Sequence, residues 1–188
     1  MALDLVVAGA WASYAWIFLA KTLRDGNLVH LGQAGAMTVF AVLFLLRRPA
    51  RRKGARWETV LAVVAVLMPI LLRPAPGPFA RLGEAVQICG LIGMVGALLS
   101  LGRSFGVAPA DRGLRTTGLY AWVRHPLYAA ELLVFAGFLV AHPSGWNVAI
   151  VGLNTLLQVV RITREERIIA DYAAYAARVR WRLIPMLW

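Results

Sequence analysis

Long apolar segments alternate with short polar connections along most of the chain. Four stretches have the length and apolar character of membrane-spanning helices, at residues 3–22, 29–46, 57–72 and 82–101. A longer apolar stretch, residues 127–160, is interrupted by His142-Pro143-Ser144-Gly145, and proline with glycine favours a turn there. The pattern predicts an all-α, polytopic membrane helix bundle of about six spans. The last two spans form a helical hairpin, and a charged C-terminal helix follows from residue 161.

The composition supports a membrane protein over a nucleic-acid-binding one. Hydrophobic residues make up 60% of the chain, charged residues only 15%, and the formal net charge is +11. The mean hydropathy of +0.68 exceeds what a soluble domain of this size needs for its core. The basic residues lie between apolar segments rather than on a soluble face, which fits anionic lipid headgroups. No nucleic-acid partner is therefore expected.

The basic residues also predict a topology. Of the 20 Lys and Arg residues, 16 fall on one side if the connection 47–56 is cytoplasmic, and four fall on the other. This asymmetry follows the positive-inside rule, so both termini and the two most polar segments are expected on the cytoplasmic side of the membrane. The first apolar segment lacks a basic leader and a cleavage site, which predicts a retained span. The chain divides into a four-span region, 1–101, and a region of loop, hairpin and C-terminal helix, 102–188.

Several residues with reactive side chains or special packing favour a structural role. Cys89 is the only cysteine, which excludes an internal disulfide, and its apolar surroundings predict a buried thiol. His30 and His142 have no neighbouring ligands at suitable spacing, so no metal site is expected. Glu58 begins a span, where a helix N-terminus favours an acidic residue. The glycines of residues 90–96 recur every third position, which predicts close helix packing.

Two polar clusters flank the hairpin, at residues 116–128 and 161–166. Because a hairpin returns the chain to its starting level, the clusters are expected to meet at one membrane surface. One candidate site then forms from four side chains: His125, Tyr128, Arg161 and Glu165. Each residue alone is typical of an interfacial cluster of aromatic and snorkelling side chains. Their order across a hairpin favours a functional site.

The motifs resemble those of a known enzyme family. Residues 118–128, Gly-Leu-Tyr-Ala-Trp-Val-Arg-His-Pro-Leu-Tyr, are similar to the G-x-Y-x-x-x-R-H-P-x-Y pattern of isoprenylcysteine carboxyl methyltransferases and the related phospholipid methyltransferases. Arg161-x-x-x-Glu165-Glu166 resembles the element after their hairpin. Tyr172-x-x-Tyr175 and residues 182–185 resemble their usual ending. The resemblance covers about residues 103–185.

The resemblance implies a methyltransferase that binds S-adenosylmethionine between the hairpin and the C-terminal tail. It implies a cofactor pocket lined by Leu114, Arg115, Tyr120, His125, Pro126, Leu127, Tyr128, Glu165 and Glu166. It further implies that Arg161 faces the substrate, and Arg161 and Glu165 are the expected catalytic residues. The cofactor carries an ammonium, a carboxylate and a sulfonium, so its pocket needs both charge signs and aromatic faces.

The acceptor and the role of Glu131 stay open at this stage. A carboxylate acceptor needs only orientation by Arg161, whereas an amine acceptor needs a base such as Glu131, Glu165 or Glu166. Glu131 lies inside the fifth span, where an ionisable residue indicates function, but it is also close enough to the interface to snorkel. The leading prediction is carboxyl O-methylation of an isoprenylcysteine-like lipophilic substrate. The alternatives are N-methylation of a phospholipid or another amphiphilic amine, or a non-enzymatic scaffold or transporter.

Overall fold

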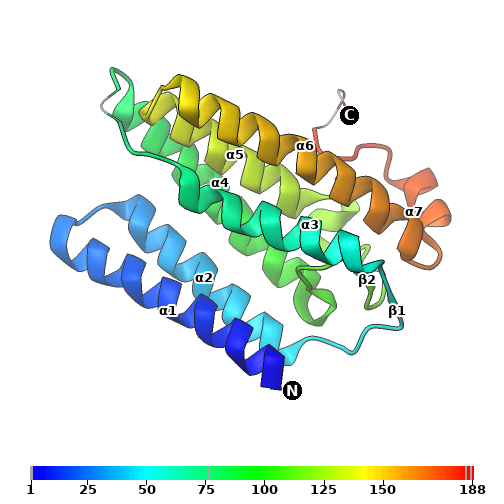
Figure 1. Cartoon of the computed structure of the whole chain (residues 1–188). Coiled ribbons are helices and arrows are strands. Elements are labelled where there is room, and N and C mark those ends of the chain that lie inside the picture. Colours follow the sequence, from blue (N-terminus) through cyan, green and yellow to red (C-terminus); the bar gives the residue numbers. More distant parts are fainter. Residues whose placement is uncertain (1, 76, 185, 187) are drawn as a thin grey trace.

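The computed structural model describes residues 2–75, 77–184, 186 and 188, with side chains from residue 5 onward. Helices dominate the described residues (Figure 1). The α-helices are α1 (Ala2–Asp25), α2 (Leu28–Leu46), α3 (Arg56–Leu67), α4 (Ala80–Leu101), α5 (Pro126–Ala141), α6 (Gly145–Ile168) and α7 (Tyr172–Arg178). Short 3-10 helices are η1 (Met68–Leu71), η2 (Gly102–Ser104) and η3 (Gly118–Ala121), and the strands β1 (Arg52–Lys53) and β2 (Ala110–Asp111) pair antiparallel.

The bundle is assembled from helices that pack in pairs. Helix α1 packs along α2, α4 packs along α5, and α3 lies against α6, while α2 joins the first pair to α4 (Figure 1). The turn between α1 and α2 is built by Gly26, which has a positive φ of 67°, and by Asn27. The Asn27 side chain caps α2 by accepting a hydrogen bond of 2.7 Å from the Val29 amide. The all-α bundle predicted from the sequence is confirmed.

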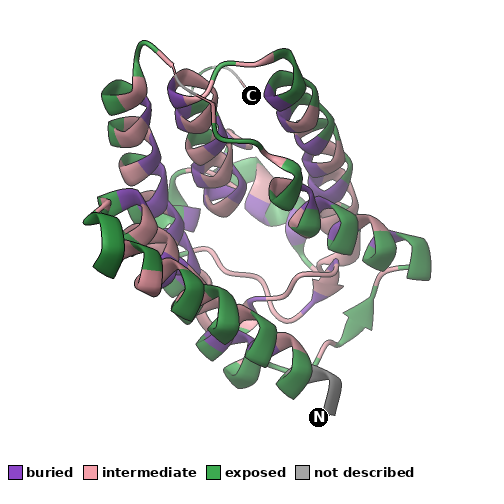
Figure 2. Ribbon diagram, turned by 60° about the vertical axis from the view of Figure 1, so that its left-hand side comes forward, coloured by how far each residue is buried: buried purple, intermediate pink, exposed green. Residues whose placement is uncertain are grey.

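The outer surface is apolar, as a bilayer requires. Large hydrophobic side chains such as Trp16, Leu99 and Leu156 are exposed, and Figure 2 shows exposed residues along the outward faces of the helices. Among the described residues, four helices are long and apolar enough to cross a membrane: α1, α2, α4 and α6. Helix α5 is apolar but has only 16 residues, and α3 has 12. The expected number of six spans therefore stays a prediction.

Two local features differ from what the sequence indicated. The third predicted span, 57–72, is not one continuous α-helix, because α3 ends at Leu67 and continues as the 3-10 helix η1. Pro69 lies in this change, where its missing N–H and its ring disfavour a regular α-helix. The prediction of a buried Cys89 thiol is wrong, because Cys89 lies on an exposed face of α4. An apolar sequence environment does not distinguish a lipid-facing position from a core one.

The hairpin break lies where the sequence predicted it. Helix α5 ends at Ala141 and α6 begins at Gly145, with Ser144 as N-cap. The fully buried Asn147 side chain donates hydrogen bonds of 2.8 Å each to the carbonyls of Arg73 and His142. These bonds fasten the turn to the connection between η1 and α4. Helix α6 is longer than expected, so the cluster 161–166 forms its last turns and the separate C-terminal helix is only α7.

Of the three α4 glycines predicted to permit close helix packing, only Gly90 lies in tight contact with α5, whereas Gly96 faces Leu119 of η3. A Cβ atom added at Gly90 would lie 2.7 Å from the Val134 amide nitrogen and 2.7 Å from Val134 Cγ2. The same atom at Gly93 would lie 3.4 Å from Ala130 Cβ, which is ordinary contact. The two glycines therefore differ in how much space they have, although they lie on neighbouring turns of one helix.

We expect Gly90→Ala to destabilise the bundle by about 1–3 kcal/mol, because the added methyl group forces α4 and α5 apart. Thermal unfolding of the purified protein in detergent measures this change. Gly93→Ala is the matched control and is expected to change the unfolding temperature little. Equal unfolding temperatures for the two variants would contradict the close α4–α5 contact at Gly90.

Candidate functional site

The predicted motif residues come together at one end of the bundle, where α5 begins and α6 ends; we call this the motif end. His125 immediately precedes α5, and Pro126 occupies its first turn. Proline fits there because N–H groups of the first turn have no hydrogen-bond partner within the helix. Tyr128 lies in the first turn of α5, three residues after His125. Helix α6 brings Arg161 and Glu165 to the same end, one helical turn apart. The expected meeting of the two polar clusters is therefore observed.

The C-terminal tail covers this end through backbone pairing. The Arg124 amide donates to the Trp181 carbonyl at 2.8 Å, and the His125 amide donates to the Arg182 carbonyl at 2.9 Å. The Tyr175 hydroxyl donates to the Tyr120 carbonyl at 2.7 Å. These bonds fix the tail against the residues that precede α5, so side chains from both segments face the end of α6.

Glu166 is the centre of a partly buried polar network, the Glu166 network. Arg182 Nε donates to its two carboxylate oxygens at 3.1 and 3.3 Å, and Arg182 Nη2 donates to Oε2 at 3.1 Å. His125 Nε2 lies 3.2 Å from Oε1, and the Tyr172 hydroxyl donates to Oε1 at 3.1 Å. Arg124 Nη1 lies 3.5 Å from the same oxygen. Both oxygens of Glu166 are thus engaged by side chains of this chain.

Burial and the hydrogen bonds to Glu166 set the charge states of the tyrosines and arginine in this region. Burial, followed by the negative charge of Glu166, raises the pKa of the Tyr172 hydroxyl well above its ordinary value. Burial also raises the pKa of Tyr175 to about 12. The hydrogen bonds to Glu166 raise the pKa of Arg182 above its ordinary value. Both tyrosines therefore stay protonated and act as hydrogen-bond donors, and Arg182 stays charged.

Arg161 forms a second group with Tyr128 and Glu165, the Arg161 cluster. The Arg161 side chain is buried, its Nη2 donates to the Val107 carbonyl at 3.0 Å, and its guanidinium lies 5.0 Å from the Tyr128 ring centroid. The Tyr128 hydroxyl donates to Glu165 Oε1. Arg161 Nε has no hydrogen-bond partner among the described residues, although it is buried. Glu131, on α5, also interacts electrostatically with this guanidinium.

The remaining predicted pocket residues lie around these groups in different surroundings. Leu114 packs against the cluster of Tyr172, Tyr175 and Val179. Arg115 points to the end of α4, where its Nε donates to the Leu101 carbonyl at 3.2 Å. Tyr120 and Pro126 are buried, whereas Leu127 packs against the core between α2, α4 and α5 and not against the Glu166 network or the Arg161 cluster.

Tyr172 and Arg182 were not among the residues predicted for the site. Both lie in the tail, and both contact Glu166. Both residues belong to the C-terminal motif that resembles the family, and this was the sequence signal that could have indicated them. Sequence spacing alone, however, does not predict that an arginine of the tail contacts a carboxylate of α6. Pro185, at the end of that resemblance, lies outside the described residues.

The fold and the site together define an integral membrane protein of the all-α class with a charged, buried polar site at one end of its helix bundle. Residues 85–171 match the model of the Isoprenylcysteine carboxyl methyltransferase (ICMT) family, which confirms the resemblance carried by the motifs. The matched segment, slightly less than half of the chain, is similar to the membrane methyltransferases of this family. No curated protein and no solved structure gives a significant match to the chain.

Proposed function

We propose that the protein transfers a methyl group from S-adenosylmethionine to the carboxylate of a lipophilic, isoprenylcysteine-like acceptor. The observation that carries this proposal is the buried Arg161 guanidinium, whose Nε has no partner among the described residues. A buried cation is costly unless an anion and hydrogen bonds complement it. Glu131 and Glu165 already place negative charge near this guanidinium, but its Nε lacks a hydrogen bond among the described residues, and an acceptor carboxylate would supply that bond.

The residues at the motif end fit the cofactor. Its α-ammonium needs an acidic partner, and the two adjacent glutamates differ in how many hydrogen bonds their carboxylates already accept. Glu166 is engaged by Arg182, His125 and Tyr172, whereas Glu165 is bonded through Oε1 to Tyr128. Glu165 is therefore the proposed partner of the ammonium, and Glu166 holds the tail against the motif end. S-adenosylmethionine supplies an activated methyl group on its sulfonium.

The chain's own residues contribute position and charge. Arg161 orients the acceptor carboxylate by charge-assisted hydrogen bonds, and the Tyr128 ring lies 5.0 Å from the guanidinium on the side of α5. The carboxylate is already a nucleophile, so no side chain has to remove a proton. Opposite charges are neutralised in such a transfer, and excluding water strengthens the interactions that align the reacting groups. The docked tail supplies this exclusion.

We expect Glu165→Gln to weaken S-adenosylmethionine binding by roughly tenfold, because a charge-assisted hydrogen bond becomes a neutral one. Isothermal titration of the purified protein in detergent measures the affinity. Glu84→Gln is the matched control, since Glu84 lies at the far end of the bundle, where it accepts a hydrogen bond from Asn27. Unchanged affinity in Glu165→Gln would contradict the proposed ammonium site.

The acceptor class is tested by the stability of the product. Membrane lipid extracts are incubated with the protein and S-adenosylmethionine that carries a labelled methyl group. A carboxyl ester releases its label in mild base, whereas a methylated amine keeps it. Base-stable label in the lipid fraction would replace the carboxylate proposal by N-methylation, for which Glu131 beside Arg161 is the base to test.

A further inference from the structure

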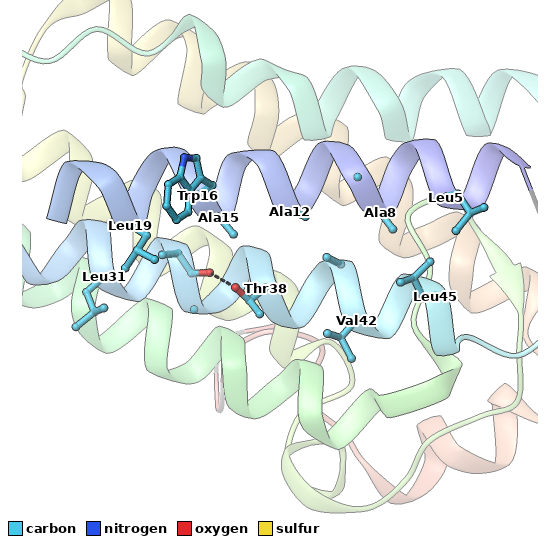
Figure 3. Close-up of a pocket in the computed structure, with 14 residues that line it drawn as sticks. Leu5, Ala8, Ala12, Ala15, Trp16, Leu19, Leu31, Thr38, Val42 and Leu45 are labelled. Carbon is cyan, nitrogen blue, oxygen red and sulfur yellow. Dashed lines mark hydrogen bonds between the residues drawn. The ribbon is translucent and has the colours of Figure 1, made fainter. Parts of the chain in front are cut away.

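An apolar groove runs along the outer side of the bundle between α1 and α2. Its volume is about 690 Å³, within the range of small-molecule binding sites (Figure 3). Side chains of α1 such as Leu5, Ala12 and Trp16 line one side, and Thr38 and Leu45 of α2 line the other. The only hydroxyl in the lining, on Thr38, already donates to the Ala34 carbonyl at 2.8 Å. Apart from the indole N–H of Trp16, the side chains that line the groove offer no free polar group, so the groove suits a hydrocarbon chain.

A basic pocket continues this groove at the motif end. Its volume is about 560 Å³, and it shares Leu5 and Leu45 with the groove. Four of its nine lining residues are basic, and none of these lining residues is acidic; the basic ones are Arg47, Arg48, Lys53 and Arg112. Apolar and cationic compartments thus lie end to end.

We propose that the groove and the basic pocket together bind one anionic membrane lipid. An acyl chain lies between α1 and α2, and the phosphate lies among the arginines and the lysine. An anionic lipid fits the basic pocket better than a second copy of the chain. If two copies met through this face, the basic residues of one copy would find no acidic partner in the other, because neither compartment has an acidic lining residue. This site is separate from the Arg161 cluster, which contains no residue from α1, α2 or the connection 47–53.

Two glycines provide a way to test the groove without disturbing the fold. Gly35 lines the groove, and a Cβ atom added there meets no heavy atom within 4 Å. Gly152, on the exposed face of α6, has equally open space and lies outside both compartments. A leucine side chain at either position would point away from the packed core, and leucine has a higher helix propensity than glycine. Gly35→Leu fills the groove, and Gly152→Leu is the matched control.

The acyl arm of the test uses native mass spectrometry of the full chain with phosphatidylglycerol. We expect the wild type and Gly152→Leu to retain the lipid equally. We expect Gly35→Leu to retain it at least about tenfold less, because the loss of even two buried methylenes accounts for that factor. Equal retention by the two leucine variants would overturn the proposal. So would a lipid-independent dimer that Gly35→Leu abolishes, because a second copy would then occupy the groove.

The headgroup arm compares phosphatidylglycerol with phosphatidylcholine carrying the same acyl chains. We expect Arg48→Gln and Lys53→Gln each to lower phosphatidylglycerol retention roughly fivefold, with Arg52→Gln, which lies outside the pocket, as control. Equal retention of the two lipids by the wild type would overturn the anionic preference. Displacement of the lipid by glycerol phosphate at equal concentration would overturn the need for the acyl chain.

Discussion

Replacing Arg161 by methionine is expected to lower kcat/KM for methyl transfer by on the order of 100- to 1,000-fold. Methionine keeps the apolar volume of the side chain but removes the buried guanidinium that is proposed to orient the acceptor. The cofactor partner Glu165 remains, so S-adenosylmethionine binding should stay within a few-fold of the wild type. A variant that loses turnover but still binds S-adenosylmethionine identifies Arg161 as a residue that acts on the acceptor.

Arg164→Met is the matched control for this prediction. Arg164 lies on the same helix, but it is only partly buried and contacts Glu58, 3.7 Å away, and the Trp57 ring, outside the Arg161 cluster. Its loss should affect activity little. Turnover of labelled S-adenosylmethionine, with cofactor affinity measured on the same preparations, compares the two variants. If Arg161→Met and Arg164→Met kept equal activity, Arg161 would have no part in the reaction.

Replacing Glu166 by glutamine is expected to lower the free energy of unfolding by about 3 kcal/mol. The carboxylate balances Arg182 and Arg124 and accepts the Tyr172 hydroxyl in a largely buried setting. Glutamine has nearly the same shape but leaves these cations without their anion. The tail should therefore detach from the motif end before the helices separate.

Two measurements identify this detachment. Thermal unfolding gives the loss of stability, and limited proteolysis should show earlier cleavage within residues 169–184 in Glu166→Gln than in the wild type. Arg182→Met, alone and combined with Glu166→Gln, completes a double-mutant cycle. Additive effects of the two changes would contradict the central position of Glu166, since residues in one network couple.

The sequence was sufficient to predict the helices and the meeting of the two motifs because both depend on local patterns. Apolar length, a Pro-Ser-Gly break and charged clusters are read directly from the chain. Helix α5 begins and ends, and α6 begins, near the predicted residues, whereas α6 continues to Ile168, past the predicted end at residue 160. The different environments of Glu165 and Glu166 were not predictable. They depend on the tail, whose Arg182 reaches Glu166 across 16 positions of sequence. The exposure of Cys89 was missed because lipid and protein core favour the same side chains.

The pairing of the tail with residues 124 and 125 has a consequence for biosynthesis. Helices α1 to α6 are made first and can enter the bilayer as their apolar segments are synthesised, whereas Arg182 and Tyr172 follow them. Until these residues emerge, the Glu166 carboxylate has only the partners that precede it in the chain. Membrane insertion and completion of the site are therefore successive events, and the second depends on a segment that contributes little to the first.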